Sequence, residues 1–142
     1  MKLFYAPAAC SLAPHIIVRE ANLDDVALVK VSLGKDRPTE DGRNFYDINP
    51  QGSVPTLELD NGEVLTEAQV LMQYLAALNP KAGLAINDGM AHWRFLETLN
   101  FIATELHKGT GPLFKNNPED VKEAAKENLV NRYQLLEKKL GD

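Results

Sequence analysis

The chain has only one cysteine, Cys10, so it cannot form an internal disulfide. It also lacks an apolar run long enough to cross a lipid bilayer. The N-terminal stretch MKLFYAPAAC has a single lysine and too short an apolar segment for a secretory signal peptide. These absences make the cytoplasm the expected compartment.

Positive charge is scarce as well: 15 Lys and Arg residues stand against 20 Asp and Glu residues, for a formal net charge of -5 at pH 7. A mildly acidic chain without a long basic run argues against nucleic acid or an anionic membrane as the main partner. With one cysteine and three scattered histidines, a metal site is not expected. The remaining composition, 44% hydrophobic and 25% charged, is that of an ordinary globular protein.

The first half of the chain alternates strand and helix signals. A short apolar strand, an apolar-periodic helix and a strand of period two follow one another at residues 2–6, 11–21 and 27–33. Ser11 is predicted to cap the helix, and Pro14 lies in its first turn, where a missing N–H costs little. A polar loop over residues 34–53 comes next. We therefore expect a strand–helix–strand unit with a right-handed crossover.

A hairpin and a helix follow this loop. Asn61-Gly62 separates two alternating runs within residues 56–66, which predicts a two-residue turn of primed type. Glu67 opens the next helix, whose apolar residues repeat at helical spacing: Val70, Leu71, Tyr74, Leu75 and Leu78. The order of elements predicts a thioredoxin-like α/β fold over residues 1–79.

The second half shows no strand signal after residues 79–83, which break the pattern and are predicted to be a linker. One helix is expected over about 88–109, and a second begins at Pro118 with Asn117 as its cap. Each helix has an apolar stripe: Phe95, Leu99, Ile102 and Leu106 on the first, and Val121, Ala125, Leu129, Leu136 and Leu140 on the second. Residues 85–142 are thus predicted to be an all-α domain.

Cys10 lies directly after the first predicted strand, where the first helix begins. Unpaired N–H groups and partial positive charge at a helix N-terminus favour thiolate over thiol. The residue three positions on is Ala13, so a thiol–disulfide cycle would need a thiol from another molecule. A lone cysteine is as often a small buried apolar side chain. On position alone, chemistry and packing are equally good interpretations.

The dipeptide Val54-Pro55 stands immediately before the predicted hairpin. Proline cannot lie inside a central strand, so Pro55 is expected at the start of one. A cis bond there would turn the backbone of Val54 outward, where it could pair with an extended peptide-like ligand. A trans bond is the commoner state of an X–Pro peptide, so position alone leaves both open.

Four stretches, MKLFYAPAACSLAPHI, INPQGSVPTLELDNGEVLTE, QYLA and LNFIATELHKGTGPLF, together resemble the cytosolic glutathione S-transferases. The cysteine-using bacterial beta class is the most similar, and the resemblance runs in order along nearly the whole chain. It implies a thioredoxin-like glutathione-binding domain over residues 1–79 and a helical domain over 85–142. It also implies glutathione as co-substrate, a homodimer, a role in detoxification and a cis bond before Pro55.

The resemblance assigns residues of the first domain to glutathione. Cys10 would contact or covalently bond the glutathione sulfur, and the backbone of Val54 would pair with the cysteinyl part. Glu67 would face the γ-glutamyl ammonium, with the N–H of Ala68 at the helix start holding the carboxylate. Lys35 would reach the glycyl carboxylate. Without the resemblance, a first-turn helix charge explains Glu67, and a solvated surface residue explains Lys35 equally well.

The second domain adds three residues. Asn100 and His107 are seven apart and would share one face of a helix. His107 matches a beta-class histidine close to the cysteine, where it could accept the thiol proton or stabilise a thiolate. Asn100 and Lys108 match positions near the ligand. Taken alone, His107 is better explained as a half-exposed histidine near a helix C-terminus.

The sequence departs from the family in three respects. Ala68 replaces a serine whose hydroxyl often contacts the ligand carboxylate, Val70 replaces a small alanine, and complete members continue with further helices. The missing helices would leave apolar stripes short of partners, which predicts association or instability. They also contribute to the electrophile pocket in complete members, so binding of glutathione is more securely expected than transferase activity.

Two reactions are expected of such a protein: conjugation of glutathione to a small electrophile, and thiol–disulfide exchange through Cys10. Two other interpretations stay open. The first is a non-catalytic glutathione-binding module that binds a partner through its helical face. The second is a one-cysteine glutaredoxin-like reductase, which fits Cys10 but not the long helices after residue 85.

Overall fold

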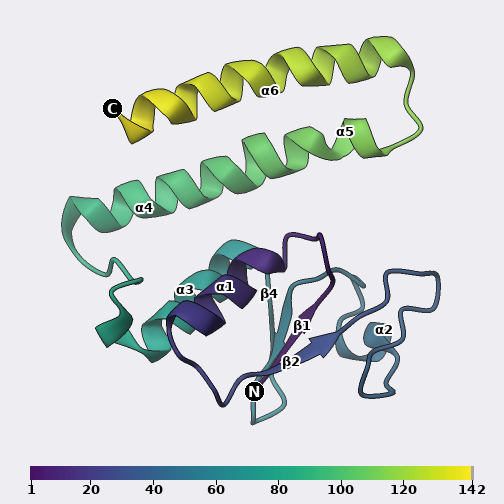
Figure 1. Ribbon diagram of the computed structural model, residues 1–142, viewed down its shortest axis with the longest axis vertical. Coiled ribbons are helices and arrows are strands. Elements are labelled where there is room, and N and C mark those ends of the chain that lie inside the picture. The colour runs from purple at the N-terminus through teal and green to yellow at the C-terminus, as the bar shows by residue number, and fades with distance from the viewer. Residues whose placement is uncertain (142) are drawn as a thin grey trace. The chain divides into compact units, whose positions relative to one another are not determined.

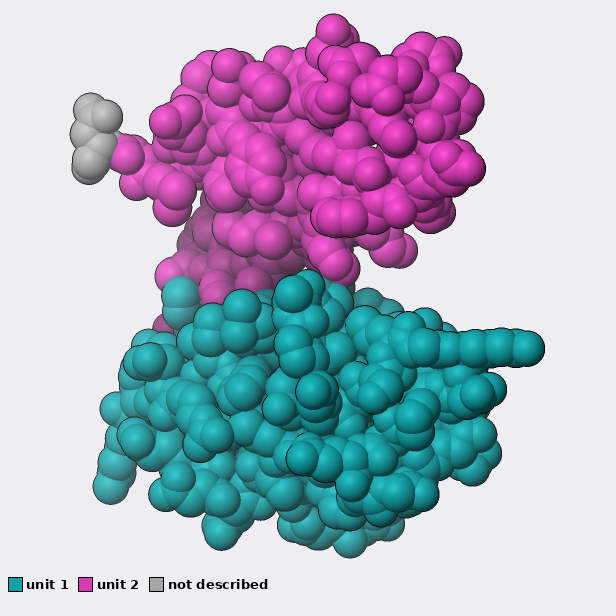
Figure 2. Space-filling view, turned by 45° about the vertical axis from the view of Figure 1, so that its right-hand side comes forward, with its two compact units in different colours: residues 1–86 teal, residues 87–142 magenta. Residues whose placement is uncertain are grey.

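The computed structural model describes residues 1–141, which form two compact units. The first comprises residues 1–86, and the second begins at Asn87 (Figure 2). All four strands belong to the first unit, and the second unit is helical, as the predicted fold class requires. None of the helices among residues 1–141 is long and apolar enough to span a membrane.

The first unit is built on a mixed sheet with the strand order β2-β1-β3-β4. Its strands are β1 (Lys2–Tyr5), β2 (Ala27–Lys30), β3 (Thr56–Glu58) and β4 (Val64–Thr66). β1 pairs in parallel with β2 and antiparallel with β3, and β3 pairs antiparallel with β4. The helices α1 (Leu12–Glu20), α2 (Phe45–Ile48) and α3 (Ala68–Leu78) complete the thioredoxin-like fold (Figure 1).

Two clusters of buried residues fill the two faces of the sheet. On one face α1 and α3 lie side by side (Figure 1), and the cluster consists of Leu3, Val18, Val26, Leu57, Leu71 and Leu75. On the other face α2 and its flanking loops bury Phe4, Ala6, Val29, Val31, Phe45 and Val54. Since successive strand residues point to opposite faces, the neighbours Leu3 and Phe4 serve different clusters.

The hairpin between β3 and β4 has a three-residue loop, so the predicted two-residue primed turn is wrong. The N–H of Gly62 donates to the carbonyl of Leu59 at 3.0 Å, and the N–H of Leu59 donates to the carbonyl of Glu63 at 2.8 Å. Gly62 has a φ of 86°, whereas Asn61 keeps a negative φ. A type I′ turn would need positive φ at both positions, so this is a type I turn followed by a glycine bulge.

The loop expected over residues 34–53 contains structure that its polar composition did not predict. α2 begins after Asn44, whose side-chain oxygen accepts the N–H of Tyr46 at 3.0 Å. β2 ends at Lys30 rather than at residue 33, and Val31 forms an isolated bridge with Thr39. Within the expected linker, residues Pro80–Ala82 form a short 3-10 helix, η1.

The apolar stripe predicted for α3 is only partly buried. Leu71 and Leu75 are fully buried, and Tyr74 packs against the same cluster. Val70 is 45% exposed and Leu78 is 41% exposed, contrary to prediction. The buried face therefore follows the i, i+4 pair Leu71 and Leu75 rather than the wider stripe.

The helix expected over about 88–109 is present in the second unit as an unbroken helical path, but it is not α-helical throughout (Figure 1). The path is α4 (Gly89–Phe101), a π-helical turn η2 (Ile102–His107), a 3-10 turn η3 (Lys108–Thr110) and α5 (Gly111–Phe114). The long helix α6 (Glu119–Leu140) follows. Gly109 allows η3 to approach α6 closely, because a Cβ there would lie 3.1 Å from a methyl carbon of Leu129.

The predicted cap and stripe of α6 need correction. The Asn117 side chain makes no cap and instead donates to the carbonyl of Pro112 at 2.9 Å, while Pro118 holds the cap position. Leu129 is buried, but Val121 is 42% exposed and Leu140 is 78% exposed. Only the middle of the predicted stripe therefore packs against the rest of the unit.

A network of charged side chains holds the turn over residues 39–43 against the sheet. The Arg43 guanidinium donates to Glu58 of β3 at 2.8 and 2.9 Å and to Asp41 at 3.2 and 3.0 Å. Asp41 also accepts from the Thr39 hydroxyl at 2.6 Å and the Lys2 ammonium at 2.9 Å. These hydrogen bonds, that of Thr39 foremost, hold the pKa of Asp41 well below its usual range.

We expect Asp41→Asn to lower the free energy of unfolding at pH 7 by about 1–2 kcal/mol, because charge-assisted hydrogen bonds of a partly exposed carboxylate are lost. The folded pKa of Asp41 is depressed, so its stabilisation is present above the unfolded value of about 3.9 and is lost as the pH falls below it. Urea unfolding should therefore show a shallower loss of stability below about pH 4 in the variant than in the wild type.

The control is Asp25→Asn, in the exposed turn before β2. It removes one carboxylate outside the network, so its free energy of unfolding should fall below about pH 4 as steeply as that of the wild type. If Asp41→Asn kept the wild-type slope below about pH 4, Asp41 would not be the group that links the network to acid stability.

Candidate functional site

Three segments meet at one end of the sheet. Cys10 follows the end of β1, in the turn that leads to α1. Val54-Pro55 precedes β3, which runs antiparallel to β1, and Glu67 follows β4, which runs antiparallel to β3. The end of an antiparallel strand lies beside the start of its neighbour. The topology therefore brings Cys10, Val54 and Glu67 together, although they are far apart in the sequence.

The Cys10 thiol is partly buried and donates a hydrogen bond to the backbone carbonyl oxygen of Val54, with 3.3 Å between sulfur and oxygen. Burial raises the pKa of the Cys10 thiol above its ordinary value. The backbone N–H groups of Cys10 and Ser11 oppose this rise, and the charge of Glu67 adds to it. The predicted stabilisation of the thiolate by N–H groups at the helix start is therefore present, but burial outweighs it.

Ser11 holds the turn around Cys10 without acting as the predicted helix cap. It has helical backbone angles, φ −62° and ψ −12°, and its side chain makes no cap hydrogen bond. Instead, its hydroxyl accepts the N–H of Ala6 and donates to the carbonyl of Ala6, both at 3.1 Å. This fully buried hydroxyl fastens the start of α1 to the end of β1, with Cys10 in between.

The peptide bond between Val54 and Pro55 is cis, as the family resemblance implied. Sequence reasoning missed two buried polar residues near it, one before the bond and one after. Asn49 and Thr56 are 3% and 0% exposed, and their side chains hydrogen-bond to each other at 2.9 Å. Both are polar residues in a polar segment, so the sequence carried no signal that would have found them.

Glu67 has an unusual backbone at the start of α3, with φ 69° and ψ 117°. Residues with a Cβ rarely adopt positive φ, and such positions gather at functional sites where the surroundings hold them. Its carbonyl accepts the N–H groups of Val70 and Leu71, each at 3.0 Å, and closes the first turn of the helix. The Glu67 side chain is exposed and raises the pKa of Cys10 by its charge.

Ala68 is the first residue of α3, and its methyl group supplies no hydroxyl for a ligand. The first N–H groups of a helix have no partner within it, so they remain the donors that this helix start can offer an anion. Lys35 lies exposed in the loop after β2.

Asn100, His107 and Lys108 all belong to the second unit, and all three are exposed. Asn100 lies in α4, His107 ends the π turn η2, and Lys108 begins η3. A π turn closes its hydrogen bonds over five residues instead of four, so it rotates His107 relative to Asn100. The shared face was predicted from α-helical spacing, which residues 102–107 do not keep.

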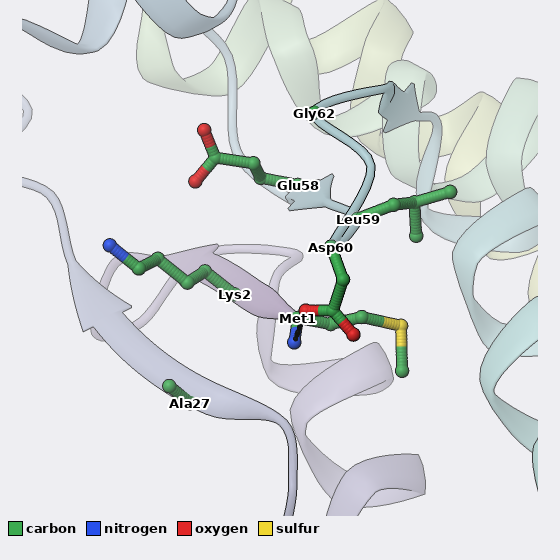
Figure 3. A pocket seen from close by; sticks show the side chains of 7 residues that line it. All are labelled: Met1, Lys2, Ala27, Glu58, Leu59, Asp60 and Gly62. Carbon is green, nitrogen blue, oxygen red and sulfur yellow. Dashed lines mark hydrogen bonds and ion pairs between the residues drawn. The ribbon is translucent and has the colours of Figure 1, made fainter.

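A shallow depression lies at the opposite end of the sheet, lined by Met1, Lys2, Ala27, Glu58, Leu59, Asp60 and Gly62 (Figure 3). The N-terminal ammonium of Met1 pairs with Asp60 there at 2.6 Å. Acidic and basic groups of this depression pair with each other or with neighbours, so it offers no convergent set of polar groups. Within residues 1–141, no group of three or more His, Cys, Asp or Glu residues could hold a metal ion.

Comparison with known proteins gives one consistent family. Residues 9–78 match the family model described as the glutathione S-transferase N-terminal domain. The chain is 45% identical to the glutathione S-transferase GstA of Escherichia coli O157:H7 over 144 aligned residues, which cover 100% of this chain and 71% of GstA.

Solved structures agree with this match. A sphingomonad glutathione S-transferase complexed with glutathione is 45% identical, with a TM-score of 0.91 over 99% of this chain and 70% of that one. The bacterial beta class glutathione S-transferase of Sphingomonas chungbukensis is 42% identical, with a TM-score of 0.89 over 100% of this chain and 71% of that one. The chain thus spans about 70% of the length of each of these proteins.

We expect Glu67→Gln to lower the pKa of Cys10, because it removes a negative charge that opposes the thiolate. Iodoacetamide reports this directly, since it is uncharged and the chain has one cysteine. The midpoint of the alkylation rate against pH should move down in the variant. Glu63→Gln, directly after the hairpin loop, is the control and should match the wild type. A midpoint unchanged or raised in Glu67→Gln would show that the two groups are not coupled.

Proposed function

This chain belongs to the glutathione S-transferase family, and from that premise we propose that it binds glutathione at the sheet end that holds Cys10. The observation that carries the proposal is the convergence of the Cys10 thiol, the cis Val54-Pro55 peptide and the start of α3 within one unit. A thiol, an exposed carboxylate and helix N–H groups are complementary to the thiol, ammonium and carboxylate of glutathione.

Each part of glutathione has a proposed partner. The backbone of Val54 pairs with the cysteinyl residue, as an extended peptide pairs with a strand edge. Glu67 accepts from the γ-glutamyl ammonium, and the N–H of Ala68 binds the γ-glutamyl carboxylate at the positive end of α3. Lys35 pairs with the glycyl carboxylate. The Cys10 thiol faces the glutathione sulfur.

The family resemblance assigns three further residues to glutathione: Asn100, His107 and Lys108. His107 accepts or donates a proton at the reacting sulfur, and the two others bind the ligand's polar groups. These assignments rest on the family resemblance.

Two reactions follow from this arrangement. In conjugation, the glutathione thiolate attacks an electrophilic carbon and a carbon–sulfur bond forms. The displaced electron pair leaves with the leaving group or, in an addition, stays on the electrophile. The raised pKa of Cys10 suits this reaction, because a protonated thiol can donate a hydrogen bond to the glutathione thiolate. In exchange, the Cys10 thiolate attacks the glutathione sulfur of a mixed disulfide between glutathione and a substrate thiol, and the substrate leaves as a thiolate. A second glutathione thiolate then attacks the protein–glutathione disulfide, which frees Cys10 and yields glutathione disulfide.

We also propose the wider setting that the resemblance implies. The protein acts in the cytoplasm as a homodimer, and its second substrate is a small electrophile or disulfide. Residues 1–79 form the glutathione-binding domain and residues 85–142 the helical domain. Ala68 in place of a serine keeps open a non-catalytic glutathione-binding module as the second candidate.

Incubation with glutathione disulfide should add one glutathione to the wild-type chain, seen as an intact-mass increase that a reductant reverses. Cys10→Ser should gain no mass, because Cys10 is the only thiol. The rate should rise with pH through the elevated pKa of Cys10. An unmodified wild type, or an equal adduct on Cys10→Ser, would exclude the exchange reaction.

Conjugation of glutathione to a chromogenic electrophile should exceed the rate of buffer plus glutathione. His107→Asn should lower kcat by at least about tenfold if the imidazole moves a proton at the sulfur. His92→Asn, in α4, is the matched control and should keep wild-type activity. A wild type that is retained on glutathione resin but shows no turnover would instead favour the non-catalytic module.

A further inference from the structure

The segment between α2 and β3 has no regular secondary structure, yet it carries the carbonyl that accepts from Cys10. Segments of this kind need side chains to hold them, because no strand or helix ladder satisfies their backbone groups. The side chain that does so is Asn49, which is 3% exposed and directly follows α2.

The Asn49 amide uses both of its ends within this loop. Its nitrogen donates to the carbonyl of Ser53 at 3.0 Å and to the hydroxyl of Thr56 at 2.9 Å. Its oxygen accepts the N–H of Gln51 at 3.0 Å. Only an amide side chain of this length provides two donors and an acceptor together, so neither Asp nor Ala could replace it fully.

Thr56 adds a second hydrogen bond to the same carbonyl. Its hydroxyl is fully buried, accepts from Asn49 and donates to the carbonyl of Ser53 at 3.0 Å. The Ser53 carbonyl therefore receives two hydrogen bonds from the buried side of the loop. Gly52 also lies tightly here, with φ 61° and the ring of Tyr46 where a Cβ would be.

The orientation of the Ser53 carbonyl determines the direction of the next N–H group, that of Val54. The peptide bond between Ser53 and Val54 is trans, so its C=O and N–H point in opposite directions. Since Asn49 and Thr56 hold the Ser53 carbonyl toward the core, the N–H of Val54 is directed away from it. The following carbonyl, that of Val54, faces Cys10.

We propose that Asn49 and Thr56 are positioning residues that aim the backbone of Val54, its N–H toward glutathione and its carbonyl toward the Cys10 thiol. The part of this proposal that concerns glutathione rests on the proposed function. The part that concerns Cys10 does not, because the contact between Cys10 and Val54 exists in the protein itself.

The test compares Asn49→Ala and Thr56→Val, which remove hydrogen bonds to Ser53, with Thr56→Ser, which keeps the hydroxyl. Calorimetry with glutathione should give a Kd raised by about fivefold in the first two variants and close to wild type in Thr56→Ser. The midpoint of iodoacetamide alkylation should fall by about half a pH unit, because the thiol loses its acceptor and part of its burial.

Asn44→Ala is the matched control, since it removes a loop asparagine that caps α2 and makes none of these contacts. It should lower the melting temperature while leaving both the Kd for glutathione and the alkylation midpoint unchanged. If Asn49→Ala does not fold, Asn49→Asp, which keeps size and the acceptor, replaces it in the comparison.

Folded Asn49 and Thr56 variants with wild-type Kd and wild-type alkylation midpoint would overturn the proposal and leave the pair a purely structural role. A wild type that fails to bind glutathione would defeat the proposed function, yet an altered alkylation midpoint in the variants would still confirm that the pair aims Val54 at Cys10. The two failures are therefore distinguishable.

Discussion

The antiparallel pairing of β1 with β3 is the constraint on which the rest of the site depends. It places the turn after β1, with Cys10, beside the segment before β3, with Val54-Pro55. Pairing of β3 with β4 then adds the start of α3 at the same end. No single segment provides a site, and a one-residue slip in either pairing would exchange the two buried faces of the sheet. The strand pairing therefore decides which residues lie together at this end of the sheet.

Two opposing effects act on the thiol at this end of the sheet. The N–H groups of Cys10 and Ser11 stabilise a thiolate, while burial and the charge of Glu67 destabilise it, and burial is the largest of these effects. The outcome is a thiol that donates to a backbone carbonyl. A cysteine in this state is better suited to donating a hydrogen bond to another sulfur than to acting as a strong nucleophile at neutral pH.

Much of the fold could be predicted from the sequence because the signals were local. A short apolar run located β1, alternation located β2 and the hairpin, helical spacing located α1 and α3, and their order gave the thioredoxin-like fold. The cis bond before Pro55 was predicted by the family resemblance, since position alone favours the commoner trans isomer. In the candidate site, the family motifs predict Cys10, Val54 and Glu67, and the sheet brings these three residues to one end.

The remaining features depend on tertiary contacts that have no local signature. Whether Asn61 takes positive φ is decided by the hairpin register, and the bonding of Ser11 to Ala6 instead of a helix N–H depends on where β1 ends. The π turn that ends at His107 cannot be predicted from an apolar pattern that assumes the same number of residues in every helical turn. Asn49 was missed because a polar residue in a polar loop attracts no notice until its burial is known.

The central claim is that glutathione binds at the sheet end formed by Cys10, Val54 and the start of α3. A titration of the isotopically labelled chain with S-methylglutathione, followed by amide resonances in NMR spectra, tests it most directly. The account predicts the largest shifts at Val54, Ala68 and the turn around Cys10. Shifts confined to the opposite end of the sheet, at Lys2, Ala27 and Asp60, or no shifts at all, would contradict it.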